Sequence, residues 1–297
     1  MSVPPIPQNG DRIHRNTPVD YSDMWTRILV GKGRFKVLFL GFDLLGMLSA
    51  GLAHAATVWN PAANGVVPPA TGNWHDAGNW TQGLPSSVAA GKAVFNLANA
   101  AECRVTNTQT CGQFVQGDNG LGGLLRVVSG GAIITSNTVW TAVGYNQTAQ
   151  TIVETGGTLS CGNHLWIGFN SPSVGTLDVN GGTVNVGAQF GLGWNSGTGY
   201  VNIRSNGALN LTQFDSTRSI SGSSVINIEL GSMIIPGDFS TAVRDYITSG
   251  KIIGYGGSGT AIYDYDVSNP GKTTVKAVTG QVPARCVWRR RNTRPTN

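Results

Sequence analysis

The segment Gly175–Gly199, GTLDVNGGTVNVGAQFGLGWNSGTG, is one copy of a repeat that fills the middle of the chain. It holds a single acidic residue, Asp178, and no basic residue. Its short runs, 177–179 and 184–186, alternate apolar and polar residues, which is typical of β-strands that bury one face. The Gly and Asn residues between the runs favour tight turns with positive φ. The segment therefore predicts short strands joined by corners.

Three sets of equivalent residues reveal the period of this repeat. The first set is a glycine column at Gly131, Gly157, Gly182, Gly207 and Gly231. Two residues downstream of each glycine stand Ile133, Leu159, Val184, Leu209 and Met233. Two residues further along stand Thr135, Cys161, Val186, Leu211 and Ile235. Successive members are 26, 25, 25 and 24 residues apart. One unit cannot bury its apolar face alone, but stacked units share a continuous core. The repeat predicts an all-β chain, a right-handed single-stranded parallel β-helix with coils of about 25 residues.

The pattern divides the 297 residues into five parts. They are a leader and signal peptide (1–55), a Trp-rich cap module with first irregular coils (56–122), regular β-helix repeats (123–237), a capping helix with closing strands (238–280) and a basic disordered tail (281–297). The helix is predicted over 238–251, where Val243, Tyr246 and Ile247 share one face and Gly250 provides the stop.

The N-terminal part has the order of a secretory signal peptide. A basic run, with Lys32, Arg34 and Lys36, precedes an apolar segment that closes on the small-residue motif Ala53-His54-Ala55. We therefore expect a secreted or cell-surface bacterial protein whose mature chain starts near Ala56. The apolar segment is short for a membrane span of about 20 residues, so no stable span is expected in the mature chain.

The net charge of +5 comes from the two ends of the chain. Residues 56–280 carry nine Lys/Arg against eleven Asp/Glu, a net charge of −2. A nucleic-acid binder would need a basic patch on its folded part. We therefore expect no nucleic-acid partner.

The chain contains four cysteines, and disulfides are permitted in an exported protein. Cys103 and Cys111 are eight residues apart, close enough for a bridge within a hairpin or between adjacent strands. Cys161 and Cys286 would then stay unpaired. The sequence has no C-x-x-C motif, so neither a zinc site nor a redox motif is predicted.

Several motifs resemble those of large exported bacterial proteins. These motifs are GNWHDAGNW (72–80), GTLDVNGGTVNV (175–186) and YITSGKIIGYGG (246–257). Over roughly residues 57–279 the chain resembles proteins with autotransporter-associated β-strand repeats, many of which end in a PEP-CTERM sorting signal. The resemblance implies an exported or surface-attached β-solenoid. The tail 281–297 keeps a Val-Pro and an Arg cluster but lacks the apolar helix of such signals.

One aromatic motif recurs at the same place in three successive coils. The motif is Gly144-Tyr145-Asn146, Gly168-Phe169-Asn170 and Gly193-Trp194-Asn195. One interpretation is a carbohydrate-binding platform, because aromatic faces bind sugar rings by apolar contact. The favoured interpretation is a structural ladder, in which Gly makes the turn, Asn bonds the backbone and the aromatic ring covers a core edge. Tyr145, Phe169 and Trp194 are the candidate ligand-binding residues.

Other candidate sites have simpler explanations. A second repeated set, Trp140, Leu165 and Phe190, predicts interior packing. His75 and His164 follow the signal peptide, and a metal site at either would need further ligands nearby. Cys161, three residues before His164, belongs to an inward-facing set, which predicts a buried free thiol. We expect no metal and no cofactor.

Catalysis is the main competing function, because β-helices also carry enzymes that degrade pectins and uronates. A hydrolase needs two carboxylates at a set separation, and a lyase needs a base and usually carboxylates for a cation. Glu154, Asp178, Asp215 and Glu229 occupy different positions of the repeat, so no catalytic residue is predicted.

The sequence therefore favours a structural or adhesive protein of the cell surface or extracellular matrix, with polysaccharide or other surface proteins as partners. The first alternative is a carbohydrate-binding module, and the second is a polysaccharide lyase or glycoside hydrolase of the β-helix type.

Overall fold

The computed structural model describes residues 56–61, 71–88, 90–96, 102–216 and 219–280, together with the backbone of a strand at 288–290. Contacts divide the chain into two units, residues 1–50 and 51–297, and every described residue belongs to the second unit. The leader and signal peptide predicted for residues 1–55 lie outside the described residues.

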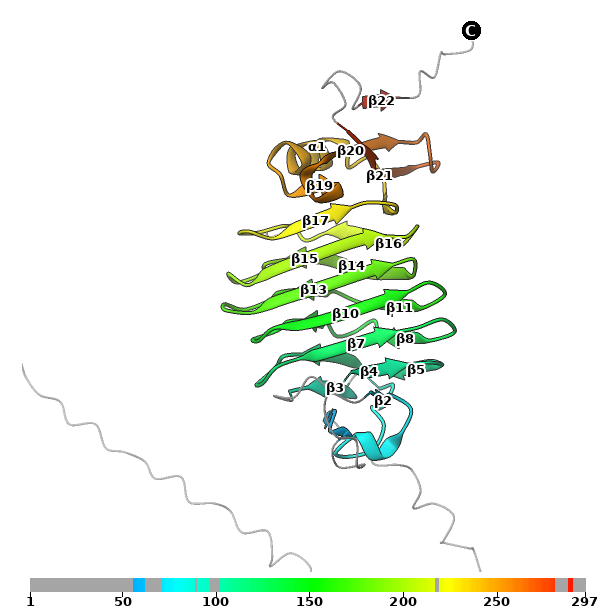
Figure 1. The fold of residues 1–297 in the computed structure, drawn as a ribbon, viewed down its shortest axis with the longest axis vertical. Coiled ribbons are helices and arrows are strands. Elements are labelled where there is room, and N and C mark those ends of the chain that lie inside the picture. Colours follow the sequence, from blue (N-terminus) through cyan, green and yellow to red (C-terminus); the bar gives the residue numbers. More distant parts are fainter. Residues whose placement is uncertain are drawn as a thin grey trace, which may run out of the picture. The chain divides into compact units, whose positions relative to one another are not determined.

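Parallel strands stack in three columns, so that each coil contributes to three faces (Figure 1). Face A consists of β2 (Gly72–Asn73), β4 (Cys103–Val105), β7 (Gly123–Val127), β10 (Ala149–Glu154), β13 (Val174–Asn180), β15 (Thr198–Arg204), β17 (Val225–Ile228) and β19 (Ile252–Gly254). Face B consists of β5 (Thr108–Cys111), β8 (Ala132–Thr135), β11 (Thr158–Cys161), the first halves of β14 (Thr183–Leu192) and β16 (Ala208–Phe214), and β18 (Ser232–Pro236). Face C consists of β1 (Ala56–Val58), β3 (Lys92–Phe95), β6 (Gln113–Gln116), β9 (Thr141–Val143), β12 (Leu165–Ile167) and the second halves of β14 and β16.

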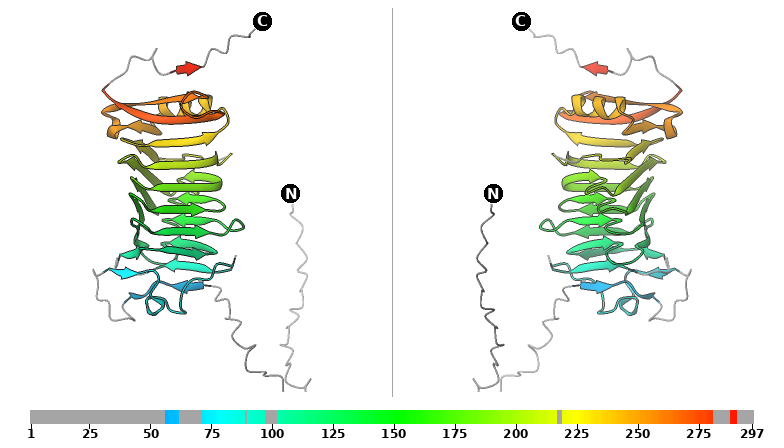
Figure 2. Two further views of the ribbon diagram at one scale, coloured as in Figure 1. Left: turned by 90° about the vertical axis from the view of Figure 1, so that its right-hand side faces the viewer. Right: turned by 90° about the vertical axis from the view of Figure 1, so that its left-hand side faces the viewer.

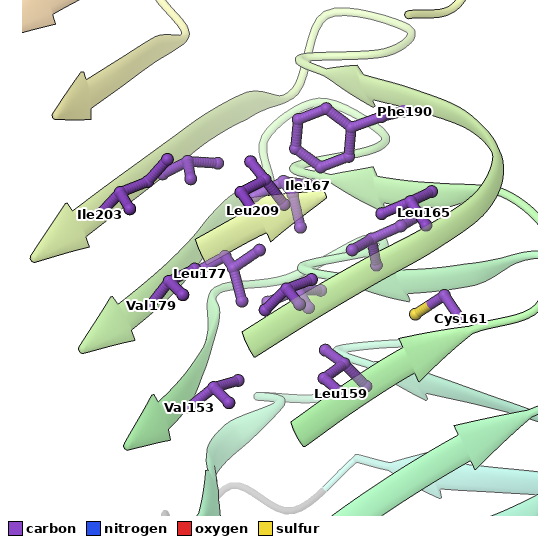
Figure 3. Close-up of a cluster of buried hydrophobic side chains, with 14 of the residues drawn as sticks. Val153, Leu159, Cys161, Leu165, Ile167, Leu177, Val179, Phe190, Ile203 and Leu209 are labelled. Carbon is purple, nitrogen blue, oxygen red and sulfur yellow. The ribbon is translucent and has the colours of Figure 1, made fainter. Parts of the chain in front are cut away.

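The strand register confirms the predicted repeat. Leu159 pairs with Ile133 in the preceding coil and with Val184 in the following one. Val184 in turn pairs with Leu209, and Leu209 pairs with Met233. All five side chains are fully buried, and the neighbouring inward-facing residues complete the core between the faces (Figure 3). The fold is thus a parallel β-solenoid of about six turns with coils of about 25 residues.

The corners between faces A and B use glycine for two different reasons. Gly181 has a φ of +82°, a conformation that suits glycine. Gly182 does not, but a Cβ atom there would lie 2.5 Å from the carbonyl oxygen of Glu154 in the preceding coil. One coil later, Ser205 and Asn206 take the positive-φ positions. The repeated glycine column therefore reflects close contact between coils rather than backbone conformation.

Aromatic side chains close the core at the N-terminal end. Trp80 lies edge-to-face against Trp59, Trp74 and Phe95, with ring centroids 5.1, 4.9 and 5.6 Å apart. Trp80 Nε1 also donates a hydrogen bond of 2.8 Å to the carbonyl oxygen of Trp74. A short 3₁₀ turn, η3 (Ala77–Asn79), connects these tryptophans. The cluster covers the first coils with apolar surface.

A helix and an antiparallel hairpin close the C-terminal end (Figure 2). The predicted helix is confirmed as α1 (Ser240–Thr248), with Val243 buried and Tyr246 and Ile247 packed against the core. The closing strands are β20 (Gly259–Tyr265) and β21 (Lys272–Thr279), preceded by the 3₁₀ turn η4 (Tyr255–Gly257). β21 pairs antiparallel with both β18 and β20, which ends the parallel stack.

The tail differs from the prediction at one place. Within the segment predicted to be disordered, β22 (Trp288–Arg290) pairs in parallel with β20, and the rest of 281–297 lies outside the described residues. None of the helices in the described part of the chain is long and apolar enough to cross a membrane.

Candidate functional site

The repeated Gly-aromatic-Asn motif forms the corner that follows face C. Gly144, Gly168 and Gly193 turn the chain there, with φ values of +73°, +68° and +71°. The predicted role of these glycines as corner residues is therefore confirmed. The corner points the following aromatic side chain away from the core, and Tyr145 and Phe169 are both half-buried.

The asparagines of the motif form a hydrogen-bonded ladder along the solenoid axis. Asn195 Nδ2 donates to Asn170 Oδ1 over 2.8 Å, and Asn170 Nδ2 donates to Asn146 Oδ1 over 2.7 Å. The ladder ends where Asn146 Nδ2 donates to the carbonyl oxygen of Asp118 over 2.6 Å. Each asparagine therefore bonds its equivalent in the next coil, a variation on the backbone bonding that the motif predicts.

The aromatic rings of the motif stack on one another along the same axis. Phe169 lies between Trp140 and Trp194, at centroid distances of 5.8 Å from both. The interplanar angles are 13° and 24°, so the Phe169 ring lies nearly parallel to both neighbours in an offset stack. Tyr145 stacks on Trp140 at 5.2 Å and 29°. A sugar ring needs an open aromatic face, and neighbouring rings on two sides reduce the face that Phe169 offers.

Two further side chains belong to this aromatic group and were not predicted from the sequence. Trp166 lies on the outer side of β12, where its strand partners are the small residues Ala142 and Gly191. It is nonetheless only 6% exposed, because Trp194 and His164 pack against it at 4.7 and 5.5 Å. The sequence 165–167 is apolar throughout and gives no signal of this arrangement; Trp166 points outward because side chains alternate along a strand and Leu165 and Ile167 face the core. We call Trp140, Tyr145, His164, Trp166, Phe169 and Trp194 the aromatic cluster.

The structure corrects the second repeated set. Leu165 pairs with Phe190 as predicted, and both are fully buried. In the preceding coil, however, the partner of Leu165 is Thr141, and Trp140 lies outside the core in the aromatic cluster. Thr141 follows Ile133 by eight residues, whereas Leu165 follows Leu159 by six, so counting in steps of 25 residues misplaces this position by one.

The possible disulfide between Cys103 and Cys111 is not formed in the structure. Cys103 and Cys111 are both free and buried. Cys103 belongs to β4 on face A, where it pairs with Leu125, whereas Cys111 belongs to β5 on face B, where it pairs with Thr135. The corner between β4 and β5 sends the two side chains into the core from different walls. Cys161 is a buried free thiol, as predicted.

Most of the described charged side chains of the regular coils lie on or next to face A. Arg126 Nη1 lies 2.6 Å from Glu154 Oε1, and Arg126 Nε lies 3.0 Å from Glu102 Oε1. Partial burial alone would lower the pKa of Arg126, but the hydrogen bonds to Glu154 and Glu102 and the negative charges of both groups together outweigh it and raise the pKa. The three residues come from three successive coils, so their ion pairs connect coils along the axis.

A second charged group continues this arrangement. Asp178 accepts hydrogen bonds from Gln150 over 2.6 Å and from Asn202 over 2.8 Å. Arg204 Nη1 lies 3.4 Å from Asp178 Oδ1, and Arg204 Nε lies 3.2 Å from Glu229 Oε1. Glu154, Asp178 and Glu229 thus lie on or next to one face, although their repeat positions differ. All three carboxylates are engaged by basic or amide side chains, which differs from a carboxylate pair held ready for acid–base chemistry.

The histidines take part in local contacts. His75 Nε2 lies 3.5 Å from Asp76 Oδ1, and His164 Nδ1 accepts a hydrogen bond of 3.1 Å from the backbone N–H of Gln189. His164 also stacks on Trp166 at an interplanar angle of 24°. Within the described residues, no group of three or more His, Cys, Asp and Glu side chains is arranged to hold a metal ion.

Comparison with protein-family models, with curated proteins and with solved structures found no match to this chain. The classification that follows from its own geometry is a parallel β-solenoid of about six turns.

Proposed function

We propose that this chain is an exported β-solenoid with a structural or adhesive role at the bacterial cell surface or in the extracellular matrix. The observation that carries the proposal is the axial pairing of its outward side chains. Asparagines bond asparagines, aromatic rings stack on aromatic rings, and arginines join carboxylates from neighbouring coils. Side chains engaged in this way stabilise the stack of coils and do not converge on a reacting group.

Export is tested by expressing the full chain in a bacterial host and separating the cytoplasmic, envelope and extracellular fractions. We expect the protein in the envelope or the medium, with a mature N-terminus at or near Ala56 by mass spectrometry. A matched control replaces Ala53 and Ala55 with Arg, which removes the small residues of the cleavage motif. A cytoplasmic protein that retains residues 1–55 would contradict the proposal.

The structural role is tested separately from export. Purified protein is added to cells in a static attachment assay and to a panel of uronate-containing polysaccharides with detection of released unsaturated ends. We expect increased attachment of cells and no release of unsaturated ends. Turnover of any polysaccharide in the panel would replace the structural proposal with an enzymatic one.

Carbohydrate binding by the aromatic cluster is a second candidate function. The observation that favours it is the partial exposure of Tyr145, Phe169 and Trp194 along one corner. Their mutual stacking weighs against it, because sugars contact aromatic faces and each ring lies against a part of its neighbour's face. A glycan array with the wild-type chain, with Trp194→Ala and with the control Tyr200→Ala decides the matter. Tyr200 is an exposed aromatic residue on face A, outside the aromatic cluster. Binding lost only in Trp194→Ala supports this candidate, and binding equal in all three chains refutes it.

A further inference from the structure

Face B differs from face A in carrying no charged side chain over several coils. The charged residues between positions 129 and 214 are Glu154, Asp178 and Arg204, and all three belong to strands of face A. The outward residues of face B are hydroxyl, amide or small apolar side chains, and neighbouring strands place them in register. They are Thr108, Thr110, Ala132, Ile134, Thr158, Ser160, Thr183, Asn185, Ala208, Asn210, Ser232 and Ile234.

A shallow groove runs along the axis at the edge of this face. Its volume is about 350 Å³, and it crosses four strands, from β8 to β16. Ile134, Ser160, Asn185 and Asn210 line it in order, with Thr212 at its side. Ile134 is 45% exposed, so one end of the groove offers apolar contact and the middle offers polar groups.

The polar groups of the groove form a fixed series of hydrogen-bond donors. Asn210 Nδ2 donates to Asn185 Oδ1 over 2.9 Å, and Asn185 Nδ2 donates to Ser160 Oγ over 3.1 Å. A primary amide carries two N–H groups and each of these bonds uses one, which leaves a second donor on each asparagine. The ladder holds both amides in one orientation at the strand spacing of about 4.8 Å. Such prior ordering lowers the entropic cost of binding.

The chemistry of the groove restricts its occupant. A charged ligand finds no opposite charge on face B, whereas face A offers several. A second copy of the chain would bury too little area, because face B measures roughly 24 by 13 Å, about 300 Å². Stable protein interfaces bury about 800 Å² on each partner. A neutral polymer with regularly spaced hydroxyl groups fits both the amide series and the absence of charge.

We propose that the groove of face B binds a neutral polysaccharide, whose hydroxyl groups accept hydrogen bonds from Asn185 and Asn210 and whose apolar ring face contacts Ile134. The inference goes beyond the proposed structural role and concerns the folded chain alone, so it stands or falls independently of export. It also assigns the polysaccharide to a site different from the aromatic cluster. Because no charge takes part, binding is expected to be insensitive to ionic strength.

Affinity electrophoresis of the full chain tests this inference. Native gels contain increasing concentrations of galactomannan, hydroxyethyl cellulose or dextran, and polygalacturonate serves as the anionic probe. The double variant Asn185→Thr/Asn210→Thr keeps good strand formers but removes the amide donors. The matched control is Asn202→Thr, an asparagine on face A in the same coil as Asn210. Circular dichroism and thermal melting verify that each variant is folded.

We expect at least one neutral polysaccharide to retard the wild-type chain and the control equally, with an unchanged effect at high salt. The double variant should bind about tenfold more weakly, since the two amide donors to the polysaccharide are lost. Should the double variant not fold, Ile134→Lys changes an exposed position and should weaken binding several-fold by placing a hydrated ammonium group in the groove. The inference is overturned if no neutral polysaccharide retards the wild-type chain, or if folded groove variants bind like the control. It is equally overturned if Trp194→Ala alone abolishes binding.

Discussion

Replacement of Gly168 by alanine should open the contact between two coils. Gly168 has a φ of +68° and begins the corner after β12. A Cβ atom there would lie 1.9 Å from the carbonyl oxygen of Thr198 in the next coil, a backbone atom. Because real Cβ contacts essentially never fall below 3.0 Å, the two coils must separate by about 1 Å at this corner.

The magnitude follows from two contributions. An L-residue in the left-handed region costs about 1–2 kcal/mol. Overpacking against a well-packed neighbour adds about 1–3 kcal/mol. We therefore expect Gly168→Ala to lower the free energy of unfolding by about 2–5 kcal/mol. The control is Gly250→Ala, where φ is +71° but a Cβ atom would meet nothing within 4 Å. The free energy of unfolding of Gly250→Ala should fall by only about 1–2 kcal/mol, the cost of the left-handed backbone conformation.

Equilibrium unfolding in urea, followed by circular dichroism and tryptophan fluorescence, measures both variants. The aromatic cluster adjoins Gly168, so its fluorescence should also change in the native state of Gly168→Ala and stay unchanged in Gly250→Ala. Equal shifts of the urea midpoint in the two variants would refute the reasoning, because the added contact between coils would then not lower the free energy of unfolding of Gly168→Ala.

Three further predictions concern the core, the asparagine ladder and the buried thiols. Leu177→Ala, at a fully buried position, should cost about 2–5 kcal/mol in urea unfolding; a loss below 1 kcal/mol would mean that this face of the core is poorly packed. Asn170→Ala removes a hydrogen bond to each neighbouring coil and should cost about 1–3 kcal/mol; a neutral result by thermal melting would show that the ladder contributes nothing to stability. Burial raises the pKa of Cys161 from 9.0 to about 12, so between pH 9 and 12 the unfolded thiol ionises while the folded one does not. Stability should therefore fall by about 1.4 kcal/mol per pH unit for this thiol above pH 9 and show no such loss below it. Cys161→Val, which introduces the residue found at this position in the next coil, should make the decline shallower; an unchanged slope would contradict the assignment.

The fold could be predicted well because every coil of a solenoid requires the same residue types at the same positions. Each coil must present an apolar residue at the same place, so the spacing from Ile133 to Met233 could be read directly and corresponds to real strand pairing. The helix at Ser240–Thr248 was equally predictable, since its apolar face and its glycine stop are local features.

Errors arose where a coil departs from the repeat or where a corner intervenes. Trp140 was assigned to the core because counting cannot locate the extra residues of its coil. Cys103 and Cys111 were paired because proximity in sequence does not reveal the corner that sends them to different faces.

The candidate site was predictable only in part, because side chains from different repeat positions meet in three dimensions. The recurrence of Tyr145, Phe169 and Trp194 identified the corner, yet Trp166 and His164 reach it from a strand and a loop at other positions of the repeat. In the same way Glu154 and Asp178 occupy different repeat positions but lie on one face. Spacing in the sequence identifies equivalent residues that align along the solenoid axis. It does not show which residues at different repeat positions lie side by side.

The central claim is that successive coils stack in strict register along one axis, and pulsed electron paramagnetic resonance measures this most directly. Thr108, Ala208 and Ser232 occupy the same strand position in different coils of face B. Ala208 lies four strand spacings from Thr108, and Ser232 lies five. Spin labels on introduced cysteines at 108 and 208 should be about 19 Å apart, and labels at 108 and 232 about 24 Å apart. The buried native thiols among the described residues should remain unlabelled in the folded chain. Each additional coil of about 25 residues thus adds about 5 Å; equal distances for the two pairs, or a shorter second distance, would contradict the stacked solenoid.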